Sequence, residues 1–107
     1  MIKLLQILLV LTPLTGFAAA YPGDEVKISR KALLCRAVPY LAEAEQLQRR
    51  GDQSGVQRFV SMSRCMQARS TLKATVIEYG HEEGRPDFVK VKARGREYWV
   101  SYSELKT

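Results

Sequence analysis

Histidine occurs once and cysteine only twice in these 107 residues, so the chain has few of the groups that build catalytic or metal sites. The one histidine, His81, lies beside Glu82 and Glu83 in a polar, glycine-containing stretch that predicts an exposed loop. A phosphate-binding glycine loop would end in G-K-[ST], and residues 80–84 lack this ending. Enzymes need an activated nucleophile, an acid–base pair or a metal. We therefore expect a protein that is not an enzyme and that has neither a metal site nor a cofactor.

Long apolar runs are also missing, and none approaches the roughly 20 residues that span a bilayer. Residues 1–20 instead have the features of a secretory signal peptide. Lys3 supplies the early positive charge, Leu4 to Leu11 the apolar run, and Ala18 to Ala20 the small-residue cleavage box. Cleavage would leave one mature domain, residues 21–107, that is periplasmic or secreted. No cysteine lies at the cleavage point, so we expect no lipid anchor.

Acidic residues are outnumbered in the mature chain. The 17 Lys and Arg without Lys3, set against 11 Asp and Glu, leave a net charge of +5. A basic surface attracts acidic partners. Export removes most nucleic acid from reach, so the expected partner is an exported protein or an acidic cell-envelope component, with membrane-surface contact as a further possibility. The competing interpretation is that these charges only keep exposed strands soluble.

The two cysteines allow one intramolecular pairing, Cys35 with Cys65. An oxidising compartment favours this pairing, and a mature chain of this size needs such a staple. A redox-active pair would normally have C-x-x-C spacing, which the sequence lacks. We therefore predict a structural disulfide.

Apolar residues recur at steps of three and four from Ser29 onward, which predicts a helix. They are Leu33, Leu34, Ala37, Val38, Leu41, Ala44 and Leu47. Pro39 interrupts the pattern and leaves two alternatives. The helix kinks there, or a short first turn carrying Cys35 gives way to a main helix that begins near Pro39.

A second helix is predicted after the first. Gly51 has the position of a C-terminal cap, and Asp52 or Ser54 can cap the helix that follows. Its apolar residues are Val56, Phe59, Val60 and Met62. The two helices together predict a helical hairpin over residues 29–64 that the disulfide closes.

The periodicity changes to alternation after Cys65, and residues 72–79 predict a β-strand. The clearest pattern is in residues 87–102, which alternate about the turn Arg94-Gly95 and predict a β-hairpin. Pairing Ala93 with Arg96 sets the register. The predicted buried inner face then carries Val89, Val91, Tyr98 and Val100. The predicted outer face carries Phe88, Lys90, Lys92, Glu97, Trp99 and Ser101.

These strand segments resemble the second half of a bacterial SH3-like domain. The resemblance is carried by Val76-Ile77-Glu78, Phe88 to Lys92, Gly95, Tyr98-Trp99-Val100 and Glu104-Leu105. With the helical segment, the chain is similar to small exported bacterial proteins that staple a helical hairpin to an SH3-like barrel. The resemblance implies an α+β fold in which the helical hairpin packs on a small antiparallel SH3-like sheet or barrel over residues 65–105. Such barrels serve as wall-binding, partner-binding and purely structural modules.

The outer face of the hairpin is the predicted binding surface, with Phe88, Lys90, Lys92 and Trp99 as its site residues. Trp99 has two interpretations, an exposed binding anchor or a lid over a second core against the helices. The predicted function is a non-enzymatic binding or accessory module that engages an envelope component or an exported protein. The alternative is a small structural or inhibitor-like component of an envelope machine, acting through surface loops such as residues 80–86.

Overall fold

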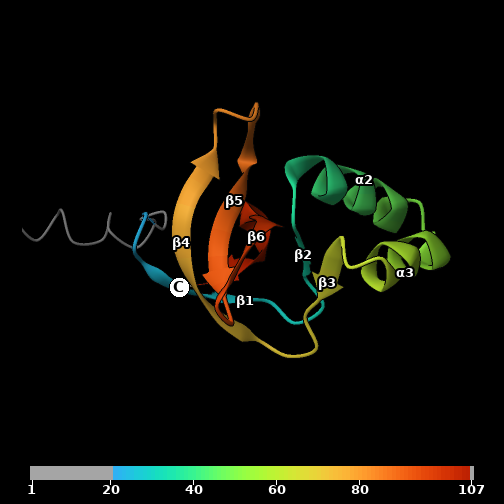
Figure 1. Ribbon diagram of the computed structural model, residues 1–107, viewed down its shortest axis with the longest axis horizontal. Helices are drawn as coiled ribbons and strands as arrows, with labels where there is room; N and C mark the ends of the chain where they lie inside the picture. Colours follow the sequence, from blue (N-terminus) through green and yellow to red (C-terminus); the bar gives the residue numbers. More distant parts are fainter. Residues whose placement is uncertain (1–20, 107) are drawn as a thin grey trace, which may run out of the picture.

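A computed structural model describes residues 21–106, which form an α+β arrangement of two α-helices and one antiparallel sheet (Figure 1). The elements are β1 Glu25–Ile28, β2 Leu33–Cys35, α2 Val38–Arg49, α3 Gln53–Ser61, β3 Cys65–Gln67, β4 Leu72–Gly80, β5 Arg85–Ala93, β6 Arg96–Ser101, the 3₁₀ turn η2 Tyr102–Glu104, and β7 Leu105–Lys106. The predicted signal peptide, residues 1–20, lies outside the described residues. Neither α2 nor α3 is long and apolar enough to cross a membrane.

The sheet has seven strands in the order β3-β2-β6-β5-β4-β1-β7. All of its strand pairs are antiparallel. The order has two ends, so the sheet that the structure describes is open and does not close into a barrel. β2 pairs with β6 at a single position, Cys35 opposite Trp99.

The predicted hairpin is confirmed in its turn and in its register. Strands β5 and β6 pair Ala93 with Arg96 and continue residue by residue to Phe88 opposite Ser101. Arg94 and Gly95 have φ of 54° and 79°. Positive φ at both central residues is the requirement of a type I′ turn, whose twist matches that of the strands it joins.

The predicted helix from Ser29 is wrong over its first part, where the chain forms β2. Lys31 has a left-handed φ of 72°, which interrupts any helix, and its N–H donates to the carbonyl of Ala68. The short run from Leu33 to Cys35 is buried at every position. A strand covered on both faces has no polar alternation, so its sequence alone resembles a helical stripe.

The main helix α2 begins at Val38, with Pro39 in its first turn, which confirms the predicted start near Pro39. The predicted short helical turn carrying Cys35 is wrong, because Cys35 ends strand β2. Gly51 follows the helix with φ of 75°, and the backbone reverses there. Asp52 caps α3, because its side chain accepts a hydrogen bond of 2.9 Å from the Gly55 N–H. This bond satisfies one of the free donors at the start of the helix.

The buried apolar side chains form two clusters, one on each face of the hairpin. The first cluster lies on the inner face and includes Val89, Val91 and Val100, all fully buried, with Tyr98 half-buried beside them. The second cluster lies on the outer face, where α2 and α3 cover the sheet. Its members include Leu41, Val56, Phe59, Phe88, Trp99 and the disulfide-bonded pair Cys35 and Cys65.

Burial disfavours the charged form of one carboxylate on α2. Glu45 on α2 is half-buried, and burial raises the pKa of its carboxyl although Arg49 and Arg85 oppose the shift. A raised folded-state pKa favours folding below the unfolded pKa, and this contribution is lost as pH rises through the folded pKa. We expect Glu45→Gln to raise the melting temperature modestly at pH 7 and to give no gain near pH 3. Thermal melts at the two pH values measure this, and a lower melting temperature at pH 7 would show that the pairing with Arg49 outweighs the burial.

Candidate functional site

The outer face of the β5–β6 hairpin is not a free surface. Phe88 is fully buried and Trp99 is 5% exposed, so the prediction that they face solvent as binding anchors is wrong. The alternation placed them on the correct face, but α2 and α3 cover that face. Trp99 is therefore the lid residue of a second core, the other interpretation that the sequence left open.

The two lysines of that face have different surroundings. Lys90 is half-buried, with its Nζ 3.6 Å from a Glu97 carboxylate oxygen and 5.5 Å from the centroid of the Trp99 ring. Lys92 is exposed, and in the strand register it lies opposite Thr75 of β4 and Glu97 of β6. The charge of Lys90 is thus engaged within the hairpin, and a binding role for either lysine stays a prediction.

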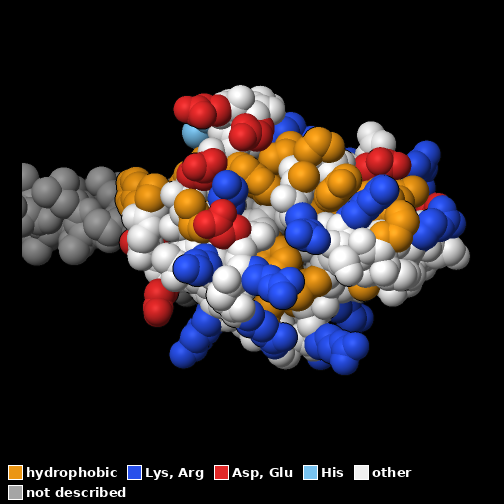
Figure 2. Space-filling view, in the orientation of Figure 1, with side chains coloured by type: hydrophobic (Ala, Val, Ile, Leu, Met, Phe, Trp, Pro, Cys, Tyr) orange, Lys and Arg blue, Asp and Glu red, His pale blue; other side chains and the backbone are white. Residues whose placement is uncertain are grey.

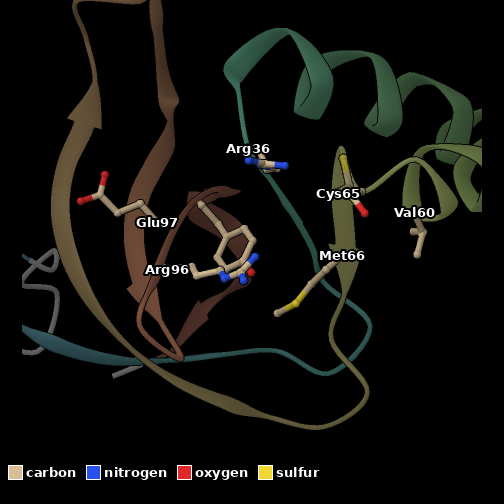
Figure 3. Close-up of a pocket in the computed structure, with 8 residues that line it drawn as sticks. Arg36, Val60, Cys65, Met66, Arg96 and Glu97 are labelled. Carbon is tan, nitrogen blue, oxygen red and sulfur yellow. The ribbon is translucent and has the colours of Figure 1, made fainter.

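The structure brings a different set of cations together, around two adjoining hollows of about 520 and 570 Å³. The hollows share Val60 of α3 and Met66 of β3 as lining residues. In Figure 3, Met66 points from β3 across the first hollow toward Arg96 of the hairpin. We call the two hollows together the arginine groove. Its basic lining residues are Arg30, Lys31, Arg36, Arg69, Arg94 and Arg96.

These cations converge because several short segments end at the same place. Arg30 and Lys31 lie between β1 and β2, and Arg36 follows β2 directly. Arg69 follows β3, and the tight turn of the hairpin holds Arg94 at its tip. The left-handed conformation of Lys31 turns the chain there, and two backbone hydrogen bonds between Ala68 and the 31–32 segment fix it against the end of β3.

Little negative charge opposes these cations. Among residues 21–106, none of the six takes part in an ion pair. Glu97 is the one acidic residue that lines the groove, and its carboxylate lies toward Lys90 and points away from the first hollow (Figure 3). Figure 2 shows Lys and Arg side chains around an apolar patch near the middle of this face and along its lower edge, whereas acidic side chains gather at the upper left.

The chemistry of the groove suits an anion with an apolar part. A guanidinium presents a planar fork of donors that matches carboxylate and phosphate oxygens, and it is more weakly hydrated than an ammonium. Five of the six cations are arginines. Between them, Val60, Met66 and Leu72 provide apolar surface on which a ligand can lie. Among residues 21–106, no group of three or more His, Cys, Asp or Glu side chains is placed to hold a metal ion.

Sequence reasoning found only part of this site. Arg94 and Arg96 belong to the predicted hairpin, where they define its turn and register, but the other four cations are scattered between residues 30 and 69. The available signal was the net charge of +5 together with basic residues at the ends of short strands. It becomes a site only when the antiparallel order brings those strand ends together. Comparison of the chain with protein-family models, with curated proteins and with solved structures finds no match.

Proposed function

We propose that this chain is a non-enzymatic binding module of the periplasm or the extracellular space that engages an acidic partner through the arginine groove. The observation that carries the proposal is the convergence of six cations on two adjoining hollows without an ion pair among residues 21–106. Unpaired like charges repel one another, and a bound anion relieves this repulsion. The disulfide supports an oxidising compartment, since such bonds persist outside the reducing cytosol.

The proposal keeps the SH3-like resemblance in a modified form. The sheet would be an SH3-like module that stays open on the side of the arginine groove, with α2 and α3 as the stapled helical hairpin. The outer face of the hairpin would then serve the second core, and binding would occur at the hollows that residues of β6 and β3 line. The partner would be an exported protein with an acidic segment or an acidic component of the cell envelope.

A charge-reversal experiment tests the groove. We expect Arg94→Asp with Arg96→Glu to weaken binding of labelled poly-L-glutamate at least tenfold, because two of the six cations become acidic. Aspartate also suits the left-handed position at residue 94, so the turn should survive. Fluorescence anisotropy at low and moderate salt measures the affinity, which should fall as salt rises.

The matched control is Lys73→Glu with Lys106→Glu, which makes the same change in net charge elsewhere. These two lysines flank Lys27 in a basic row across β4, β1 and β7. Unchanged binding in this control, within about twofold, supports a local site. Equal losses in both variants would show that only net charge matters, and a larger loss in the control would move the site to the lysine row. Phosphatidylglycerol vesicles and soluble polyphosphate are titrated in parallel with poly-L-glutamate. Tighter binding of either one would identify a lipid or a phosphate ligand in place of an acidic polypeptide.

A second candidate function is inhibitor-like, through the turn that joins β4 to β5. This turn projects from the body of the molecule (Figure 1), and all four of its residues, His81 to Gly84, are exposed. A projecting acidic turn suits insertion into a basic cleft of a partner. In captures from envelope extracts, loss of a specific partner on Glu82→Gln with Glu83→Gln, but not on the groove reversal, would favour this second function.

A further inference from the structure

A further hollow, separate from the arginine groove, lies at the end of β5 and β6 that is opposite to their Arg94-Gly95 turn. It has a volume of about 290 Å³ and is lined by Tyr79, His81, Pro86 and Tyr102. The Tyr79 ring lies 6.1 Å from the His81 ring and 6.0 Å from the Tyr102 ring, centroid to centroid, with interplanar angles of 43° and 48°. The His81 and Tyr102 rings are therefore each inclined to the Tyr79 ring and do not stack flat on it. We call this feature the aromatic hollow.

Four different elements build the aromatic hollow. Tyr79 lies near the end of β4 and packs against the inner core, so it forms a firm back wall. His81 comes from the β4–β5 turn, Pro86 from β5 and Tyr102 from η2. Tyr102 is 41% exposed, which is high for a large aromatic residue. Tyr21, which is 63% exposed, lies close enough to contribute to the raised pKa of the Tyr79 phenol, whose main cause is burial.

Most charged residues near the aromatic hollow are acidic, and the nearby Arg85, which precedes Pro86, is ion-paired with Asp87. Among residues 21–106, no Lys or Arg lines the aromatic hollow. Asp24 is close enough for its carboxylate to raise the pKa of Tyr79 further, after burial and Tyr102. Glu82 and Glu83 follow His81 directly in the exposed turn, and Figure 2 shows acidic side chains around the histidine. The molecule thus has opposite polarity at its two hollowed regions, basic at the arginine groove and acidic here.

These observations select a class of ligand. Aromatic faces attract cations through the ring quadrupole, most favourably when several faces surround a cation that gives up its water easily. A quaternary ammonium group has no N–H donor, and its methyl groups form an apolar surface that fits among aromatic rings. Phosphate groups and the anionic backbone of a nucleic acid are disfavoured by the nearby carboxylates. We propose that the aromatic hollow binds a quaternary ammonium group, with the rings of Tyr79, His81 and Tyr102 around it and the nearby carboxylates supplying long-range attraction.

The test compares choline chloride with 3,3-dimethyl-1-butanol, a neutral molecule of the same shape. We expect choline to shift the amide NMR signals of the β4–β5 turn and η2, and to bind at least fivefold more tightly than the neutral analogue. Tyr102→Ala should weaken choline binding at least fivefold, whereas Tyr102→Phe, which keeps the ring face, should stay within about twofold. His81→Ala in the exposed turn is a second variant should Tyr102→Ala fail to fold.

The outcomes are separable from those of the proposed function. The groove reversal Arg94→Asp with Arg96→Glu should leave choline binding unchanged. None of the residues that line the aromatic hollow among residues 21–106 also lines the arginine groove. Vesicles of phosphatidylcholine, compared with vesicles of phosphatidylglycerol, distinguish a lipid headgroup from a free small molecule as the source of the ammonium group. Equal binding of choline and the neutral analogue, or no binding of choline, would overturn the inference. Unchanged binding by both Tyr102→Ala and His81→Ala would also overturn it.

Discussion

Replacing Trp99 with alanine is expected to lower the free energy of unfolding by about 3–5 kcal/mol, the cost of truncating a buried aromatic residue. Trp99 is 5% exposed and packs with Phe88 in the core that α2 and α3 cover. Its partner on β2 is Cys35, and the indole belongs to the same buried cluster as the disulfide. A small domain has about 5 kcal/mol of total stability at the lower end of the usual range. The variant should therefore be largely unfolded at 37 °C.

Urea denaturation of the wild type and of Trp99→Ala measures this effect. Trp99→Phe is the graded control, because it keeps an aromatic ring and should lose less stability than the alanine variant. Lys92→Ala is the control on the same strand pair, and as an exposed substitution it should change stability by less than about 0.5 kcal/mol. A Trp99→Ala protein as stable as the wild type would mean that the helices do not cover the outer face. The outer face of the hairpin would then again be the candidate binding surface.

Removing the Cys35–Cys65 disulfide should cost about 3–4 kcal/mol in the chain-entropy description. The two residues are 30 apart in sequence, and the enclosed loop contains all of α2 and α3. They are also direct partners on the antiparallel strands β2 and β3, with their Cα atoms 3.9 Å apart. The bond therefore joins β2 to β3 where the chain enters and leaves the helical segment, and Cys35 also pairs with Trp99 of β6.

Urea denaturation with and without a reductant measures this contribution, and a Cys35→Ala, Cys65→Ala protein excludes effects of free thiols. Thiol titration of the unfolded, unreduced protein should find no reactive sulfhydryl. Two reactive sulfhydryls per chain would show that the bond is absent from the isolated protein. An unchanged urea midpoint after reduction would show that packing alone holds the helices.

The hairpin could be predicted to the residue because its information is local. A two-residue turn at Arg94-Gly95 and a strict alternation on both sides leave one register, and β5 and β6 adopt it. Alternation also assigned Phe88 and Trp99 to the correct face. It could not show whether that face is covered, because the covering helices come from a distant part of the chain.

The start of the first predicted helix could not be assigned from local sequence. The buried run from Leu33 to Cys35 has no polar position, so a period of two cannot be distinguished from a helical stripe. The neighbours β3 and β6 decide that this run is a strand, and both follow it in sequence. The arginine groove could not be predicted for the same reason. Its six cations belong to segments that meet only after β2, β3 and the hairpin have assembled.

The central claim is that the binding surface lies at the arginine groove and not on the outer face of the hairpin. NMR signals of the arginine side-chain Nε–Hε groups, followed during titration with poly-L-glutamate, test it directly. We expect the signals of the groove arginines to shift and saturate together, namely those of Arg30, Arg36, Arg69, Arg94 and Arg96. The helix arginines Arg49, Arg50 and Arg58 serve as internal controls and should stay in place. Equal shifts in both sets, or shifts confined to the helix arginines, would contradict the claim.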